Sequence, residues 1–239
     1  MNTEAFLLSL RLSATVAVLL QLFALPLAYA LAFAKWRGKF LVESVVALPL
    51  VLPPTVLGFY VLLAIGSRSP IGRLWMAWTG HGLAFTFEAL VVASILYSLP
   101  FAVQPISASF AQLDRSLLDA SATLGAGSWR TFTRVVLPLS VEGVIAGAVL
   151  SFAHTLGEFG VVLMVGGNLP GVTRTVSIAI YDQVQSLQYD AANRTAFALM
   201  AFSFLVLAAV FLAAYLLLRD VHREAETAEI GRASCRERV

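Results

Sequence analysis

Five long apolar runs dominate the sequence, and each is long enough to cross a lipid bilayer, which takes about 20 apolar residues in a helix. They cover residues 6–34, 40–65, 84–110, 139–165 and 195–218. The runs are continuous, whereas the strands of a membrane β-barrel are short and alternate apolar with polar residues. Because a helix in lipid satisfies its own backbone hydrogen bonds, we predict an all-α integral membrane protein with about five transmembrane helices.

The composition also argues against a soluble domain. Of the 239 residues, 59% are hydrophobic and 13% are charged, whereas ordinary domains have about 45–50% apolar and about 25% charged residues. So few charges cannot form the polar surface of a soluble fold. The net charge of +2 is weak and scattered, which argues against nucleic acid as a partner. A single cysteine, Cys235, excludes an internal disulfide framework.

The basic residues between the runs predict the orientation, because cytoplasmic loops carry an excess of Lys and Arg. With five spans, one side of the membrane holds eight basic residues in three regions and the other side holds four. The first set is Lys35, Arg37, Lys39, Arg115, Arg130, Arg134, Arg219 and Arg223, and the second is Arg68, Arg73, Arg174 and Arg194. This bias predicts the N-terminus outside and the C-terminus in the cytoplasm.

Three segments are set apart from the spans. Residues 166–193 are too polar to face lipid, so we expect a re-entrant or surface helix on the outer side. Residues 219–228 are assigned to a cytoplasmic tail. Residues 229–239 read EIGRASCRERV and resemble translated sequencing-adapter sequence. We interpret them as a non-native artefact with no part in the fold, the alternative being a real polar tail.

One face of the fourth run carries small and polar side chains. Gly143, Gly147, Ser151, His154 and Glu158 fall within about 80° of one another on a helix. The G-x-x-x-G pair lets two helices approach closely, and residues spaced i, i+4, such as His154 and Glu158, can face each other. An ionisable residue inside a membrane helix indicates a functional site. Two interpretations stay open: a polar path or subunit interface, or a His–Glu hydrogen bond that only holds helix packing.

Prolines interrupt the second run at Pro49, Pro53 and Pro54 and the third at Pro100 and Pro105. Proline removes a helical hydrogen bond, which membranes tolerate where neighbouring helices or water satisfy the backbone. Broken helices therefore indicate a pathway, with ordinary kinked packing as the alternative. The candidate residues for a translocation path or gate are Pro53, Pro54, Gly147, Ser151, His154, Gly157 and Glu158.

Motifs for catalysis and nucleotide binding are missing from the sequence. It has no H-E-x-x-H zinc site, no G-x-S-x-G elbow and no P-loop. The three histidines, His81, His154 and His222, do not have the spacing of a metal cluster. We therefore expect no enzyme, no metal site and no cofactor in this chain.

The loop at residues 111–138, between the third and fourth runs, carries the strongest motif. Its first part is rich in alanine and predicts a helix, which Gly125 and Gly127 end with a turn. A second amphipathic helix is expected up to Pro138. A helix of small residues suits insertion into a cleft of another protein.

This loop resembles the coupling loop of permease subunits of binding-protein-dependent ABC importers. Their pattern is Glu-Ala-Ala, then Gly four residues on, and an Ile-x-Leu-Pro ending. Here Asp replaces Glu, Ser replaces the second Ala and Val replaces Ile, which keeps the charge and the small sizes. The matching positions are Asp119, Ala120, Ser121, Gly125, Val135, Leu137 and Pro138.

Further segments resemble the molybdate permeases of this family. They are residues 48–54, 123–127, 156–160, 167–171 and 173–175. Sulfate and thiosulfate permeases share a looser version of the same segments. The resemblance covers residues 8–218.

The resemblance implies a type I ABC importer permease fold and the permease subunit of an ATP-driven importer for molybdate and tungstate. Two copies would form the path, and a dimer of separate ATPase subunits, which bind ATP-Mg, would dock on the coupling loops. A periplasmic or lipid-anchored binding protein would deliver the oxyanion. The implied location is the plasma (inner) membrane of a prokaryote, crossed several times.

Two other functions remain open. A sulfate or thiosulfate ABC permease would use the same mechanism for another tetrahedral dianion. A proton-coupled secondary anion carrier would use His154 and Glu158, and its uptake would survive loss of any ATPase. A membrane-embedded enzyme is disfavoured, because the sequence shows no nucleophile–base or metal pattern.

Overall fold

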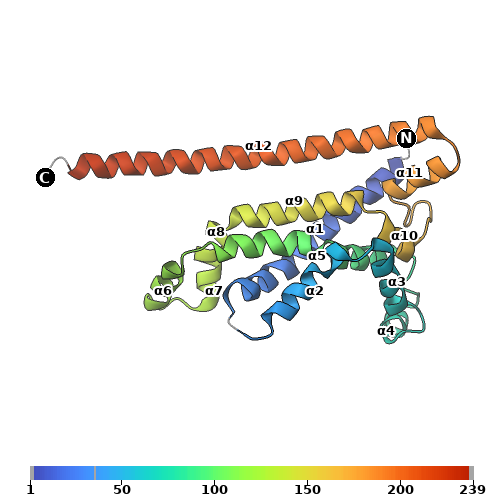
Figure 1. Ribbon diagram of the computed structural model, residues 1–239, viewed down its shortest axis with the longest axis horizontal. Coiled ribbons are helices and arrows are strands. Elements are labelled where there is room, and N and C mark those ends of the chain that lie inside the picture. The colour runs from blue at the N-terminus through green and yellow to red at the C-terminus, as the bar shows by residue number, and fades with distance from the viewer. Residues whose placement is uncertain (1–2, 35, 237–239) are drawn as a thin grey trace. The chain divides into compact units, whose positions relative to one another are not determined.

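The computed structural model describes residues 3–34 and 36–236, with side chains as far as residue 212. The regular structure in this part of the chain is entirely helical (Figure 1). Lys35, which contributed to the predicted orientation, and residues 237–239 of the predicted artefact lie outside the described residues. In chain order the elements are α1 (Thr3–Phe33), α2 (Lys39–Val51), α3 (Pro54–Ile65), α4 (Pro70–Thr79), α5 (Phe87–Ala111), α6 (Arg115–Thr123), α7 (Ser128–Thr131), the π-helical η1 (Phe132–Val136), α8 (Leu137–Leu139), α9 (Val141–Gly157), α10 (Gly160–Gly166), α11 (Val176–Gln185) and α12 (Tyr189–Arg236).

Three of the described helices are long and apolar enough to cross a membrane alone: α1, α5 and α12 over Tyr189–Leu212. Two bent pairs raise this number to five if each pair forms one span. These are α2 with α3, bent by 115°, and Ser128–Leu139 with α9, bent by 74°. The predicted all-α membrane fold is therefore confirmed, with three to five candidate spans.

Two of the predicted spans are not continuous helices. The second run breaks between α2 and α3, where Pro53 and Pro54 lack backbone N–H groups. The fourth run breaks at Glu158 and Phe159, between α9 and α10, so the prediction of one uninterrupted run over residues 139–165 is wrong. By contrast, α5 continues through both of its prolines, so of the two interpretations of these prolines a broken helix does not apply to the third run.

Helices α1, α5 and α9 pack along one another and form the main core (Figure 1). The close approach predicted for the G-x-x-x-G pair is confirmed, and the helix that approaches is α5 of the same chain. A Cβ atom on Gly143 would lie 2.4 Å from the Ser109 Cβ, and one on Gly147 would lie 2.8 Å from the Ala102 carbonyl oxygen. The largest fully buried side chains of this core include Leu12, Val16, Leu20, Leu90, Val103, Ile106 and Phe110.

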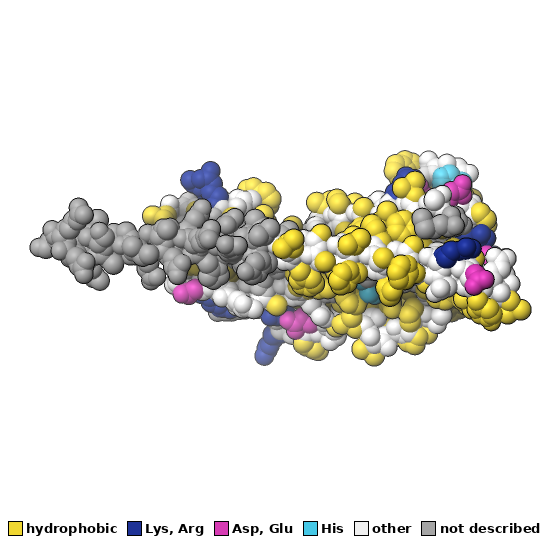
Figure 2. Space-filling view, turned by 90° about the horizontal axis from the view of Figure 1, so that it is seen from above, with side chains coloured by type: hydrophobic (Ala, Val, Ile, Leu, Met, Phe, Trp, Pro, Cys, Tyr) yellow, Lys and Arg dark blue, Asp and Glu magenta, His cyan; other side chains and the backbone are white. Residues whose placement is uncertain are grey.

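The bundle carries different structures at its two ends (Figure 1). The short helices α6 and α7 lie at one end of α5 and α9, whereas α3, α4 and α10 gather at the other. Figure 2 shows that hydrophobic side chains outnumber charged ones among the described residues seen from above. The chain divides into two units, residues 1–196 and 197–239, and the second contains the continuation of α12.

Candidate functional site

The loop that carries the family motif folds into a helical hairpin joined by a buried hydrogen bond. The Ser121 hydroxyl on α6 and the Thr131 hydroxyl on α7 lie 2.8 Å apart, and both residues are buried. At the start of α6, the Asp114 carboxylate accepts a hydrogen bond from the Ser116 backbone N–H at 2.9 Å, which lowers the pKa of the Asp114 carboxyl group. Ser121, which replaces the second alanine of the family pattern, thus has the Thr131 hydroxyl as its hydrogen-bond partner.

Changing Ser121 to alanine tests this hydrogen bond. The variant leaves the buried Thr131 hydroxyl without its partner, so we expect a loss of about 1–3 kcal/mol in the stability of the hairpin. Hydrogen exchange of the amides in α6 and α7, measured on the solubilised complex, reports this loss. The double variant Ser121→Ala/Thr131→Val removes both polar groups and should lie closer to the parent than the single variant does. A double variant that is less stable than the single one would contradict this account.

Gly125 ends α6 in a left-handed conformation, with φ of +76°. Its N–H donates to the Ala122 carbonyl at 2.9 Å, and the Ala126 N–H donates to the Ser121 carbonyl at 3.1 Å, which is the Schellman pattern of a helix C-terminus. A Cβ atom at Gly125 would meet nothing within 4 Å. Backbone conformation, rather than lack of space within the chain, therefore requires the glycine.

The outer surface of the hairpin exposes large apolar side chains, of which Leu124 and Trp129 are the most exposed and Leu117 is 43% exposed. Leu124 is 87% exposed and Trp129 is 76% exposed, on either side of the turn that contains Gly125 and Gly127. Asp119 and Ala120 on α6 are also exposed. Leu124 and Trp129 are not among the residues predicted from the sequence, although two large apolar residues in a polar loop were the available signal.

Aromatic side chains connect this hairpin to the membrane helices. The Phe132 ring lies 5.5 Å from the Tyr29 ring of α1 and 6.3 Å from the Phe110 ring of α5, in edge-to-face geometry. The Trp129 ring lies 5.9 Å from Phe132. Leu137 and Pro138, the end of the family motif, lie in α8, which leads directly into α9. The hairpin therefore contacts α1 and α5 through packed rings and continues along the chain into α9.

The two helix breaks meet at a pocket of about 610 Å³, here called the junction pocket. A Cβ atom on Gly160, at the start of α10, would lie 2.7 Å from the Pro54 Cβ at the start of α3. Of the candidate path residues, the pocket brings together Pro54, His154, Gly157 and Glu158, with Thr55, Tyr97, Ala153, Phe159 and Gly160. Pro53 precedes α3 as its N-cap. Gly147 and Ser151 do not line the pocket; both are buried on α9.

His154 forms its contacts with α5. Its Nδ1 atom lies 2.9 Å from the Ser98 hydroxyl, and its ring stacks on Phe101 with a centroid distance of 4.0 Å. The Ser98 hydroxyl also lies 3.0 Å from the Thr155 hydroxyl. The sequence did not predict Ser98 or Phe101 as partners, because a contact across 56 residues of the chain leaves no local pattern.

Glu158 is buried without a hydrogen-bond partner. Its exposed fraction is 5%, and neither carboxyl oxygen has a partner among the described atoms. The His154–Glu158 hydrogen bond, one of the two interpretations of this helix face, is therefore absent from this conformation. The reason is local: α9 ends one residue earlier, and the Glu158 backbone is extended, with ψ of 138°. The i, i+4 geometry that would bring the two side chains together does not form.

The polar segment after α10, where a re-entrant or surface helix was expected, folds into a loop and the short helix α11. The Asn168 side chain donates to the Asp182 carboxylate at 3.2 Å and accepts a hydrogen bond from the Arg174 guanidinium. Arg174 and Asp182 also form an ion pair at 3.8 Å. This segment contacts the second helix break, because the Tyr181 ring of α11 lies 5.0 Å from the Phe159 ring.

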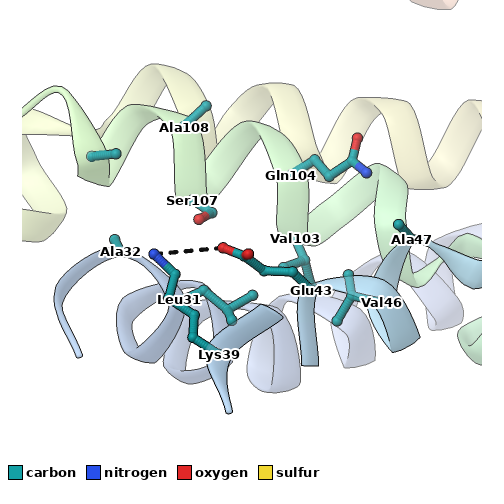
Figure 3. Close-up of a pocket in the computed structure, with 11 residues that line it drawn as sticks. Leu31, Ala32, Lys39, Glu43, Val46, Ala47, Val103, Gln104, Ser107 and Ala108 are labelled. Carbon is teal, nitrogen blue, oxygen red and sulfur yellow. Dashed lines mark ion pairs between the residues drawn. The ribbon is translucent and has the colours of Figure 1, made fainter. Parts of the chain in front are cut away.

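A second pocket, of about 460 Å³, lies among α1, α2 and α5. Lys39 and Glu43 of α2 lie at this pocket, with Lys39 Nζ 3.5 Å from Glu43 Oε1 (Figure 3). Ser107 and Gln104 supply the polar side chains from α5. No group of acidic, His or Cys side chains suited to a metal ion occurs among the residues that the structure describes.

Comparison with known proteins identifies the family. The family described as "Binding-protein-dependent transport system inner membrane component" matches residues 24–220. The chain belongs to this family. The match includes the whole coupling loop and both helix breaks.

Two similar proteins are named as molybdenum transport permeases, and a less similar one is named as a sulfate transport permease. The "Molybdenum transport system permease protein ModB" of Azotobacter vinelandii is 49% identical over 88% of this chain and 93% of its own length. The protein of the same name from Escherichia coli K12 is 42% identical over 77% of this chain and 80% of its own length. A "Probable sulfate transport system permease protein cysT" of Chlorella vulgaris is 30% identical over 80% of this chain and 71% of its own length.

Solved structures support the fold. A chain of a bacterial alginate ABC transporter, crystallised with an alginate-bound periplasmic protein, aligns with a TM-score of 0.70 at 18% identity, over 87% of this chain and 76% of that one. A chain of the MetNI methionine ABC transporter in an inward-facing conformation aligns with a TM-score of 0.64 at 17% identity, over 88% of this chain and 93% of that one. At these identities the likeness concerns the fold alone.

Proposed function

We propose that this chain is the permease subunit of an ATP-driven importer for molybdate, and also for tungstate, in the inner membrane of a prokaryote. One observation carries the proposal: relatives from three bacterial genera, 40–49% identical over 74–88% of this chain, are named molybdenum transport permeases. The chain has no P-loop, so a separate ATPase binds ATP-Mg and hydrolyses it. The permease itself carries no cofactor.

In this proposal the chain crosses the membrane five times, with the hairpin of α6 and α7 in the cytoplasm. The arrangement of basic residues supports this orientation. Lys39 at the start of α2 lies near the end of α5, just before the hairpin that carries Arg115 and Arg130. At the opposite end of the bundle, Arg68 precedes α4 and Arg73 lies within it (Figure 1). The N-terminus is then outside and the C-terminus inside.

The exposed hairpin is the docking element for the ATPase. Its apolar side chains, Leu124 and Trp129, are exposed beside the small residues of α6. An amphipathic helix that presents such anchors suits a groove on a partner protein. Two permease copies and two ATPase subunits then form one importer, and a periplasmic or lipid-anchored molybdate-binding protein delivers the anion to the outer side.

The junction pocket is a candidate part of the path, with Pro54, His154, Gly157 and Glu158 around it. Two helix breaks at one place support this assignment, since broken membrane helices are tolerated where they line a cavity or are covered by protein. We assign Pro53, Gly147 and Ser151 to the supporting structure of the path.

Uptake in reconstituted vesicles tests the function. We expect the complex of permease, ATPase and binding protein to accumulate molybdate only when ATP is supplied on the cytoplasmic side, because the coupling hairpin transmits hydrolysis to the path. Tungstate should compete with molybdate, and a large excess of sulfate should compete weakly. Uptake that persists without the ATPase and collapses with the proton gradient would instead indicate a secondary carrier.

A sulfate or thiosulfate permease is the second candidate, and the Chlorella relative favours it. Its identity, 30%, is lower than the 49% of the Azotobacter relative. Strong competition by sulfate in the same assay would select this candidate. The proton-coupled alternative lacks the direct His154–Glu158 contact that motivated it, because His154 pairs with Ser98.

A further inference from the structure

The α9–α10 break lies beside a second break, so the helices beyond the two breaks are placed to move together. Helix α3 packs on α10, and the two helices touch at their first residues, Pro54 and Gly160. A hydrophobic cluster that includes Val61 and Ile65 of α3 and Val161 and Val165 of α10 holds them together. Motion about one break is then accompanied by motion about the other, as in a hinge made of two helix junctions.

The backbone at the α9–α10 break is suited to two conformations. Glu158 is extended, whereas the residues before it are helical. It lies between Gly157 and Phe159, and Gly160 follows. Gly157 has free space around it, since a Cβ atom there would meet nothing within 4 Å. Glycine adopts several backbone conformations at low cost, so a turn of helix can form or unwind at this point.

The Glu158 side chain is poorly satisfied in the observed conformation. Both carboxyl oxygens are buried without a hydrogen bond, a state that costs free energy whatever the charge of the group. The Ser94 hydroxyl is also buried without a hydrogen-bond partner among the described atoms. A buried polar group without a partner in one conformation favours another conformation in which it has one.

His154 is the partner that the sequence spacing offers. If α9 continued for one more turn, Glu158 would lie four residues after His154 on the same helix face. In the observed conformation α9 stops short, and His154 bonds to Ser98 instead. The histidine thus has two alternative partners, and the choice depends on whether the helix is broken at Glu158.

We propose that the α9–α10 break is a two-state hinge of the transport cycle, in which His154 exchanges Ser98 for Glu158 as α9 extends by one turn. Glu158 is then a positioning residue: it holds the extended state and does not bind the anion. The proposal rests on the proposed transport function for its purpose, but the exchange of partners is a property of this chain. The free-energy cost of leaving the Glu158 carboxyl group unpaired in the broken state keeps the broken and extended conformations close in free energy.

Replacing Glu158 by leucine separates this role from a structural one. Leucine removes the unpaired carboxyl group from the broken state and cannot pair with His154 in the extended state. We therefore expect Glu158→Leu to raise the melting temperature of the resting permease–ATPase complex while lowering ATP-driven uptake by about tenfold or more. Glu158→Gln keeps a hydrogen-bonding side chain and should retain most of the uptake. The matched control is Glu142→Leu, at an exposed position in the first turn of the same helix, which should change neither quantity.

A double-mutant cycle tests the exchange itself. His154→Ala and Glu158→Leu should each lower the transport rate. The double variant should transport no more slowly than the less active single variant, because both substitutions remove the same contact. Ser98→Ala should lower the melting temperature of the resting complex and leave uptake substantial. Additive losses from His154 and Glu158, or a Glu158→Leu complex that melts lower than the parent, would overturn the proposal.

The same measurements distinguish failure of the hinge from failure of the proposed substrate. If the parent complex hydrolyses ATP but accumulates no molybdate, the substrate assignment is wrong. The melting temperatures still decide the hinge, as does the double-mutant cycle when ATP hydrolysis replaces uptake as its readout, because neither measurement depends on the transported anion.

Discussion

The variant Gly125→Val is expected to uncouple ATP hydrolysis from uptake while the membrane helices stay folded. Valine is β-branched and strongly disfavours a positive φ, whereas Gly125 has φ of +76° and donates one of the two hydrogen bonds that close the α6 C-terminus, the other coming from the Ala126 N–H. Strain of about 1–3 kcal/mol at such a position is enough to redirect the chain after α6. The exposed residues Leu124 and Trp129 would then no longer present one surface to the ATPase. Retention of the ATPase on purified permease and uptake per ATP hydrolysed measure the effect.

Two further variants isolate backbone conformation as the cause. Gly125→Asn should keep coupling close to the parent level, because asparagine accepts a left-handed conformation more readily than other residues do. Gly127→Ala should also be tolerated, since Gly127 has φ of −70° and free space around it. If Gly125→Val retains the ATPase and couples normally, the hairpin is a connector without a role in docking. If Asn is as harmful as Val, side-chain size at the interface matters and backbone conformation does not.

The sequence predicts best those features that depend on local patterns. Apolar runs of sufficient length became helices, and the Ala-rich segment ending at Gly125 became α6 with a left-handed C-terminus. The close approach at Gly143 and Gly147 also followed from spacing on one helix face. In each case the residues that decide the structure lie within one or two turns of one another, so the pattern contains the necessary information.

The features that the sequence did not predict depend on contacts between distant segments. The break at Glu158 contains no proline, and it forms where α10 packs on α3 beside Pro54. The partner of His154 comes from α5 and not from its own helix. Proline was a poor guide in α5, which accommodates Pro100 within one continuous helix. Tertiary packing can therefore break a helix where the sequence has no proline, and it can keep a helix continuous where the sequence has one.

The largest effect on folding is expected for Gly147→Leu, because this residue sets the distance between α5 and α9. The Cβ atom alone would lie 2.8 Å from the Ala102 carbonyl oxygen, and the remaining leucine atoms would meet the Ile106 side chain. A backbone carbonyl inside a helix cannot retreat as a flexible side chain can, so the two helices must separate. Overpacking costs about 1–3 kcal/mol where neighbours can yield, and here we expect more, since α5 and α9 also pack on α1 in the same core.

The yield of monodisperse permease in detergent and its melting temperature measure this effect. Gly147→Ala should give an intermediate loss, because it introduces the Cβ clash without the rest of the side chain. Leu150→Phe adds bulk on the exposed face of the same helix and should be tolerated. A Gly147→Leu permease with the yield and melting temperature of the parent would show that α9 can move away from α5 at little cost. The separation of these two helices would then belong to the functional motion of the chain, because the contact between them would no longer be what holds the bundle together.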